Sequence, residues 1–218
     1  MSQAVPTPPH DEVGRLSAFD GTPARQVRAV FDDETITVYQ AYSAAIATPA
    51  AANDSFAGTP FKLDRMTWIK PSFLWMMYRS GWATKPGQEH VLAIQATRTG
   101  FEEALALACL SHFDAEVYPD HATWAERKEV SPVRVQWDPE RSIALEPLQW
   151  RSLQVGLSGS AALNYSNNWI VQIDDVTEQV HEIHQAIAAG RPETARAKLP
   201  TERPYPLPRD IATTIGAS

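Results

Sequence analysis

The chain has 218 residues, a hydrophobic share of 44% and a formal net charge of −7. This length suits one folded domain with a sizeable buried core. The negative charge argues against a general electrostatic grip on duplex nucleic acid, although it leaves room for a local basic pocket. Cys109 is the single cysteine, which excludes an intrachain disulfide and a cysteine-rich zinc site and suits the reducing cytosol.

The two ends differ in composition from the middle of the chain. Residues 1–24 are rich in proline and small polar residues, so we expect a flexible N-terminal arm ahead of a single domain at 25–200. The prolines of 201–218 predict an extended C-terminal tail. The arm lacks the basic and apolar regions of a signal peptide, and no apolar run is long enough to span a membrane. We therefore expect a cytoplasmic protein with no membrane partner.

Strand and helix patterns alternate between these ends. In chain order they predict a strand at 26–31, a strand at 35–42, a helix at 43–52, a strand at 65–70, a helix at 71–81, a strand at 89–98, a helix at 99–113, strands at 132–138 and 151–157, a helix at 158–168, a strand at 169–175 and a helix at 176–190. The first two strands are close enough to form a hairpin. No series of βαβ units with glycine-rich turns is present, so we expect an α+β fold, a single domain with a mixed, mainly antiparallel, bent sheet and flanking helices.

Several catalytic signatures are absent from the sequence. It contains no GxxxxGK[ST], no GxGxxG, no HExxH and no GxSxG. The sequence therefore argues against a classical P-loop enzyme, a Rossmann dehydrogenase and a lipase-type hydrolase.

The segment KLDRMTWIKPSFLWMMYRSGW, residues 62–82, is unusual because it sets cations among large apolar side chains. It holds three of the seven tryptophans and three of the four methionines, with Asp64 as its one carboxylate. Its cations are Lys62, Arg65, Lys70 and Arg79. Lys70 and Ser72 stand at the expected turn from strand to helix, where free N–H groups and the helix dipole favour an anion. The alternatives are a surface lysine and a helix whose aromatic residues serve only the core.

Two further groups of residues are candidates for a ligand site. Tyr39, Gln40 and Tyr42 end the strand at 35–42, where they can frame a planar ring or simply complete the core and edge of the sheet. Arg28, on the neighbouring strand, needs an anionic partner, which is either a ligand or a carboxylate of the turn at 32–34.

Polar residues also end a later strand. Arg151 and Gln154 lead into the turn after 151–157, and Gln154 is a neutral hydrogen-bonding group that cannot act as a general base. His181 and His184 have the helical spacing of a metal pair, but no third ligand is evident, so we expect exposed helix histidines and no metal.

Three long blocks carry a resemblance to a known family. RAVFDDETITVYQAY, FKLDRMTWIKPSFLWMMYRSGW and the later RSLQVGLSG with WIVQIDDVT resemble a bacterial family known only as domain of unknown function 4291. The resemblance runs from about Arg25 to His184, which is most of the chain. It implies no established reaction.

A more remote resemblance concerns the fold of the ADP-ribosyltransferases. VYQAYS and the helix after it look like the first strand and helix of that fold, TWIKPSF resembles its second strand, and EHVLAIQAT resembles the next core strand. On this resemblance Gln40 and Ser72 take two of the catalytic places, and Gln154 or a nearby carboxylate takes the third. NAD is the cofactor, and the acceptor is a nucleic acid or a small molecule. Gln40 stands where the family has His or Arg, and Gln154 stands where it has Glu.

These observations combine into one hypothesis about a pocket. The cations of 62–82 neutralise the phosphate of a small molecule or of a nucleic-acid end, and the aromatic residues stack on its base. The expected ligand-binding residues are Arg28, Tyr39, Tyr42, Arg65, Trp68, Lys70, Arg79 and Arg151. A non-catalytic module that binds a nucleotide or an RNA end is the alternative to the enzyme, and the oligomeric state stays open.

Overall fold

Two β-sheets meet at a single bridge in the computed structural model, which describes residues 21–218. One sheet has the strand order β3-β7-β6-β5, the other has the order β2-β4-β8, and a small third sheet pairs β1 with β9. The strands are β1 (Arg28–Ala29), β2 (Thr35–Tyr42), β3 (Thr67–Ile69), β4 (His90–Thr97), β5 (Ala108–Leu110), β6 (Val133–Arg141), β7 (Pro147–Leu157), β8 (Ile170–Asp175) and β9 (Arg203–Pro204). The expected arm at 1–24 lies outside the described residues except for 21–24.

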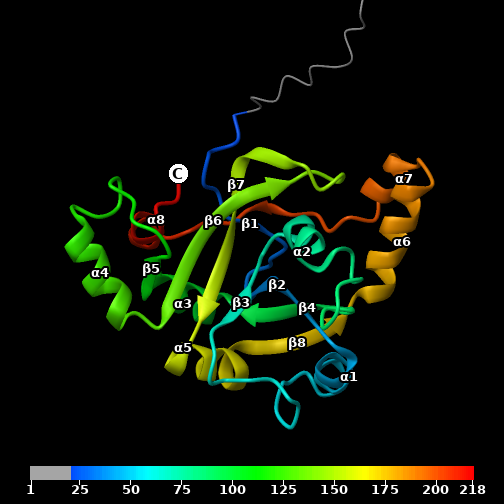
Figure 1. The fold of residues 1–218 in the computed structure, drawn as a ribbon, viewed down its shortest axis with the longest axis horizontal. Helices are drawn as coiled ribbons and strands as arrows, with labels where there is room; N and C mark the ends of the chain where they lie inside the picture. Colours follow the sequence, from blue (N-terminus) through cyan, green and yellow to red (C-terminus); the bar gives the residue numbers. More distant parts are fainter. Residues whose placement is uncertain (1–20) are drawn as a thin grey trace, which may run out of the picture.

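Helices surround the two sheets (Figure 1). They are α1 (Ala44–Asn53), α2 (Phe73–Ser80), α3 (Arg98–Ala106), α4 (His121–Val130), α5 (Gly159–Asn164), which continues into a π-helical turn η1 (Tyr165–Trp169), α6 (Thr177–Ala188), α7 (Pro192–Arg196) and α8 (Arg209–Ile215). Among the described residues no helix is long and apolar enough to cross a membrane. The sequence analysis did not predict α4 and α7.

The fold class is α+β in a single domain, as expected, but the strands do not form one bent sheet. All neighbouring strands of the three sheets pair antiparallel except β5 and β6, which are parallel. The strands of the two larger sheets run in clearly different directions in Figure 1, where β6 and β7 stand steeply and β4 and β8 lie across. The link between these sheets is an isolated bridge at which the N–H of Tyr39 donates to the main-chain oxygen of Lys70 at 2.7 Å.

The expected hairpin at 26–42 is present in shorter form, at residues 30–37. Strand β1 itself pairs with β9 from the C-terminal segment. Just after β1 the chain pairs antiparallel with the start of β2 through the Phe31–Ile36 bridge and a hydrogen bond of 2.9 Å from the N–H of Thr37 to the main-chain oxygen of Val30. The turn between them is closed by Asp32, whose carboxylate accepts hydrogen bonds from the main-chain N–H groups of Glu34 and Thr35. A tight hairpin thus forms around this turn, while the earlier residues of the predicted first strand pair with β9.

The helix predicted at 99–113 is too long. It begins at an N-cap, since the Thr97 hydroxyl accepts from the N–H of Gly100, and it ends at Ala106. The next strand, Ala108–Leu110, is the buried β5 beside β6. A short apolar run is compatible with a buried strand or a buried helix, and periodicity alone does not separate them.

The expectation of an extended C-terminal tail is also wrong for its last part. Prolines end at Pro208, after which Arg209–Ile215 form α8. Tyr205, Ile211 and Ile215 are buried in the core of the domain. Apolar residues at helical spacing therefore dock this segment despite its prolines.

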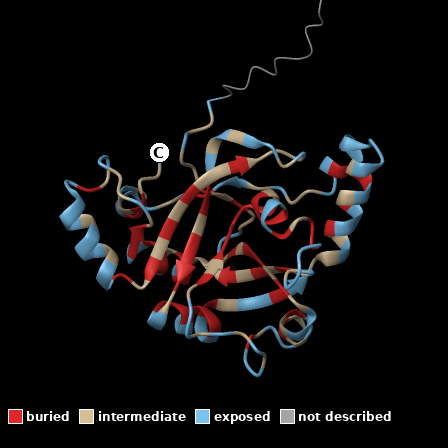
Figure 2. Ribbon diagram, in the orientation of Figure 1, coloured by how far each residue is buried: buried red, intermediate tan, exposed pale blue. Residues whose placement is uncertain are grey.

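The buried residues are concentrated on the two larger sheets and on α2 (Figure 2). The central strands and α2 are largely buried, whereas α4 and the outer sides of α6 and α7 face solvent. Ser72 begins α2 as its N-cap, because its hydroxyl accepts from the N–H of Trp75, and Gly81 ends the helix with a φ of 60°. Helix α2 contacts both β2 and β6, so it lies where the two sheets come together.

Candidate functional site

A cleft of about 480 Å³ opens where the two sheets meet. Strand β2, the segment through β3, helix α2, the loop at 86–88 and the paired strands β6 and β7 all contribute to it. Its lining residues are Gln40, Ala41, Tyr42, Arg65, Met66, Thr67, Trp68, Lys70, Trp75, Met76, Arg79, Pro86, Gly87, Gln88, Gln136 and Gln154. Most of the residues predicted for a ligand site thus lie together, although they come from distant parts of the chain. The volume is in the range of ordinary small-molecule sites.

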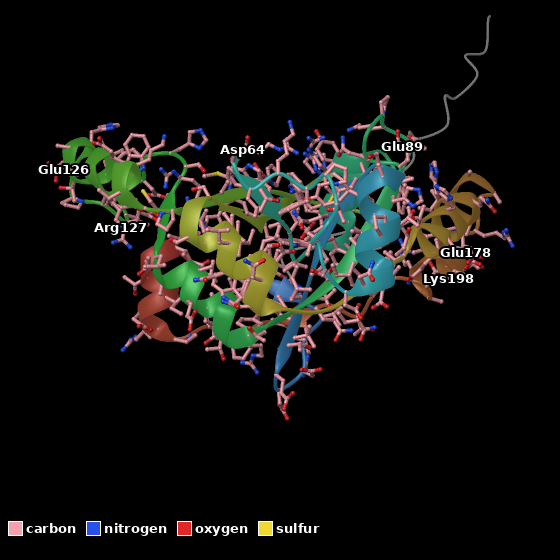
Figure 3. The ribbon with its side chains drawn as sticks, turned by 90° about the horizontal axis from the view of Figure 1, so that it is seen from below. Asp64, Glu89, Glu126, Arg127, Glu178 and Lys198 are labelled. Atoms are coloured by element: carbon pink, nitrogen blue, oxygen red, sulfur yellow. The ribbon has the colours of Figure 1, made fainter. Side chains whose placement is uncertain are left out.

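Three cations converge on this cleft. Arg65 and Arg79 are exposed at its edge, while Lys70 is 5% exposed. Within residues 21–218, no ion pair at 4.0 Å or less joins any of the three to a carboxylate. Asp64, the one acidic residue of the segment, is exposed at the surface before β3 (Figure 3). The fold thus brings together three of the four cations expected to converge, without Arg151, and no carboxylate of the described residues pairs with them at ion-pair distance.

Lys70 occupies the bridge between the sheets, and this position explains its burial. Its ammonium nitrogen lies 3.4 Å from the main-chain oxygen of Trp68 and 5.2 Å from the centre of the Trp75 ring. Burial, with a further contribution from the positive charge of Arg79, lowers the pKa of Lys70 to about 7, against a partial opposing effect of Asp138. The sequence suggested an anion-binding lysine but gave no sign of this change in its protonation.

Trp68 provides the accessible aromatic surface of the cleft. It is half-buried, and it lies opposite Gly156 in the register of β3 and β7. A Cβ atom at Gly156 would stand 3.0 Å from the Trp68 ring and 2.5 Å from the sulfur of Met66. The absence of a side chain at Gly156 therefore lets Trp68 and Met66 lie close against β7.

Trp75 is buried, and it also lines the cleft. Its ring packs edge to face with Tyr78 and lies beside the ammonium group of Lys70. Within the described residues its indole N–H has no hydrogen-bond partner. A buried donor without an acceptor is unfavourable, so the wall of the cleft contains a polar group whose hydrogen-bonding capacity is unused.

The Gln40 side chain is buried at the centre of a hydrogen-bond network, so its amide already has partners within the protein. Its amide nitrogen lies 2.8 Å from the Tyr42 hydroxyl, 2.8 Å from the Thr67 hydroxyl and 3.1 Å from the main-chain oxygen of Trp68. Its amide oxygen accepts from the Tyr165 hydroxyl at 2.9 Å. Gln40 therefore joins β2 to β3 and helps to position Trp68.

Tyr42 also contributes less surface than predicted. It is buried, and its ring packs edge to face against Phe56 and Phe61. Burial raises the pKa of its hydroxyl to about 12. Tyr42 stays neutral at physiological pH and supports the cleft wall, and its ring is largely covered by neighbours.

The sequence analysis missed a polar cluster on β6 and β7. Asp138 accepts hydrogen bonds from the side-chain amides of Gln136 at 2.8 Å and Gln154 at 2.5 Å. A carboxylate only accepts, so it turns the NH₂ groups of both glutamines toward itself. Within the described residues the two side-chain oxygens accept no hydrogen bond, and both glutamines line the cleft. The cluster thus offers two amide oxygens to donors of a ligand.

Ser72 and Arg28 lie in a second cleft of about 300 Å³ on the other side of the start of α2. The Ser72 hydroxyl donates to Glu140 at 2.8 Å, and Glu202 accepts from the main-chain N–H of Phe73 at 2.7 Å. Burial raises the pKa of both glutamates, that of Glu202 to about 8, and the charge of Glu140 adds to the effect on Glu202. The prediction that Ser72 joins Gln40 and Gln154 in one site is therefore wrong.

The remaining predicted residues also lie outside the first cleft. The Tyr39 ring is buried against Phe73 in the core. Arg151 lines a third cleft and donates to the main-chain oxygen of Trp137 at 3.1 Å. Arg28 donates to Gln26 and to a main-chain oxygen, and not to a carboxylate of the turn at 32–34.

No cluster of three or more potential metal ligands is present within the described residues. His184, one of the two histidines with metal-like spacing, instead stacks on the Trp82 ring, with 5.3 Å between the ring centres.

Comparison with known proteins gives a family but no function. The model of a family described as Domain of unknown function (DUF4291) matches residues 26–205. No curated protein matches the chain. The matched range includes both large sheets and every residue that lines the first cleft.

Proposed function

The chain belongs to the DUF4291 family, and we propose that its first cleft binds a nucleotide, with NAD as the substrate of an ADP-ribosyltransferase-like reaction. One observation carries the proposal. Arg65, Lys70 and Arg79 converge on the cleft without carboxylates in ion-pair contact, next to the exposed face of Trp68. Arg65 and Arg79 need a counter-charge, and a phosphate-bearing ligand supplies it. The same ligand favours the protonated form of Lys70, whose pKa is otherwise lowered to about 7.

The other groups of the cleft fit the remaining parts of a nucleotide. The Trp68 ring suits stacking on a planar base, a contact that works with any base because each has a π-face. The side-chain oxygens of Gln136 and Gln154 suit the hydroxyl groups of a ribose or the NH₂ group of an amide. A nucleotide combines phosphate, a planar ring and such donors in one molecule, whereas a simple sugar phosphate lacks the ring.

The proposed reaction breaks the bond between nicotinamide and C1′ of the adjacent ribose. Nicotinamide leaves with the bonding electron pair, positive charge develops on the ribose, and the nucleophilic atom of an acceptor bonds to C1′ and releases a proton. The acceptor is a nucleic acid or a small molecule. The order of elements β2, α1, β3, α2 and β4 is the order that the remote resemblance implies, which supports this reaction by analogy of fold.

A non-catalytic module that binds a nucleotide or an RNA end is the second candidate. The hydrogen bonds of Gln40 favour it, because its amide is occupied within the protein. Gln154 is neutral and stabilises a positive ribose less well than a carboxylate does. In this case the cleft recognises the same ligand features without breaking a bond.

Calorimetric titration with NAD, ATP and a 5′-phosphorylated RNA oligonucleotide, each in turn, tests the binding. We expect saturable binding of at least one of them and a rise in thermal stability, since a ligand at 100 times its dissociation constant stabilises the native state by about 2.7 kcal/mol. Arg65→Ala should abolish this binding, whereas Arg209→Ala, at an exposed site on α8, should preserve it. No binding of any of the three ligands would refute both candidate functions.

Release of free nicotinamide then separates the two candidates. The enzyme should release nicotinamide from NAD slowly with water as acceptor and faster when a true acceptor is added. Tight binding of NAD without any release, in the presence of RNA, DNA and small-molecule acceptors, would favour the binding module.

A further inference from the structure

Lys70 differs from ordinary surface lysines in three ways. It is almost completely buried, it lines the first cleft, and no carboxylate of the described residues forms an ion pair with it. Within residues 21–218 its ammonium group donates one hydrogen bond, to the main-chain oxygen of Trp68, and that bond is long at 3.4 Å. Lysines are seldom buried to this degree unless they are paired.

The charges around Lys70 favour its neutral form. Arg79 approaches from α2 and opposes a second positive charge, and only Asp138 on β6 acts in the other direction. Burial is the largest effect and, with Arg79, brings the pKa of the amine to about 7. The cleft therefore favours an unprotonated, nucleophilic amine at Lys70 around neutral pH.

We propose that Lys70 captures the carbonyl group of small phosphorylated aldehydes and ketones, such as open-chain sugar phosphates, as a covalent imine. The amine nitrogen bonds to the carbonyl carbon, the nitrogen loses its protons, and the carbonyl oxygen leaves as water. The C=N bond replaces the C=O bond, so no oxidant or reductant is consumed. Arg65 and Arg79 hold the phosphate, and this part of the inference rests on the phosphate site of the proposed function.

Reductive labelling of the wild-type protein tests the inference. The probe is pyridoxal 5′-phosphate, which carries both an aldehyde and a phosphate, and borohydride traps the imine as a stable amine for peptide mass spectrometry. Lys62, an exposed lysine of the same segment, is the internal reference. At pH 7.5 a lysine with a pKa near 7 is mostly neutral, whereas one with the ordinary value near 10.5 is neutral in only about 0.1% of molecules.

We expect Lys70 to react roughly tenfold or more faster than Lys62 at pH 7.5, with half-maximal labelling near pH 7. Pyridoxal, which lacks the phosphate, should label Lys70 much less than pyridoxal 5′-phosphate, and Arg65→Ala should remove that difference. Labelling of Lys70 no faster than Lys62, or labelling that begins only above pH 9, would overturn the inference. Equal labelling by the two aldehydes would overturn the role of the arginines in selecting phosphate.

The outcome is separable from that of the nucleotide proposal. Binding of NAD with an unreactive Lys70 leaves the nucleotide site standing and refutes the imine. Selective labelling of Lys70 without binding of any nucleotide supports the imine and refutes the nucleotide ligand.

Discussion

Glu202→Gln should make the protein more stable at neutral pH and should reduce the dependence of its stability on pH. The Glu202 carboxyl lies in the second cleft, where burial and the neighbouring charge of Glu140 raise its pKa to about 8. The hydrogen bond from the N–H of Phe73 and the positive charge of Arg28 oppose the shift only in part. The folded state therefore holds a proton that the unfolded chain releases from about pH 4.5 upward.

The sign of the effect follows from proton binding. Below pH 4.5, the ordinary pKa of a glutamate, Glu202 is protonated in both the folded and the unfolded state. Its titration therefore does not change the free energy of unfolding in that range. Between 4.5 and about 8 the folded state binds more protons than the unfolded state, so the free energy of unfolding falls as the pH rises. The slope is about 1.36 kcal/mol per pH unit, which gives roughly 2.7 kcal/mol between pH 5 and pH 7.

Urea denaturation at pH 5, 6 and 7 measures this difference. The range stops at pH 7 because Lys70, whose pKa is lowered to about 7, begins to stabilise the fold above that value as the pH rises. The amide side chain of the variant keeps an oxygen that accepts from the N–H of Phe73 but cannot ionise, so the variant should lose less stability than the wild type over the range. Glu126→Gln, at an exposed site on α4, should match the wild type (Figure 3).

Parallel loss of stability in the wild type and Glu202→Gln would refute the reasoning. It would mean that the Glu202 carboxyl is solvated well enough in the folded state to ionise normally.

Three further predictions concern the first cleft. Trp75→Ala should lower the free energy of unfolding by about 3–5 kcal/mol in urea denaturation. Trp68→Ala should weaken nucleotide binding more than it lowers stability. Equal losses of stability in the two variants, with unchanged nucleotide affinity, would contradict this distinction. Gly156→Ala should cost about 1–3 kcal/mol through overpacking and weaken binding by displacing Trp68, and unchanged calorimetric affinity would count against that ring contact. Asp138→Asn should turn one glutamine amide around and reduce affinity without changing the melting temperature by more than a few degrees, and an affinity equal to that of the wild type would remove the role of the glutamines.

Much of the cleft could be predicted because its cations are close together in the sequence. Arg65, Lys70 and Arg79 lie just before a short strand, at the turn after it and on the following helix, so local geometry alone keeps them near one another. The pairing of Gln136 with Gln154 across β6 and β7 depends on register, which the local pattern does not give. Polar residues at alternate positions of β6 are also what any strand with one solvated face shows, so Asp138 carried no distinct signal.

The larger errors of the fold have the same origin in long-range pairing. Strand β1 joins β9 from the other end of the chain, and no feature of either two-residue strand indicates the other. Strand β5 is a strand because β6 lies beside it, while its residues also suit the end of a helix. By contrast β2, β4 and β8 were located correctly, since their alternation or apolar content is strong over six residues or more.

The start of α2 separates basic residues from acidic ones, and this arrangement bears on what the first cleft binds. Lys70 lines the cleft that holds the unpaired cations, and Ser72, two residues later, lines the cleft that holds Glu140 and Glu202. These two acidic groups therefore line a different cleft from the cations. Burial raises the pKa of both, that of Glu202 to about 8, so they favour the uncharged form more than exposed glutamates do. Because a fold that gained stability from pairing would have brought the two groups together, the separation favours an external anion as the partner of the cations.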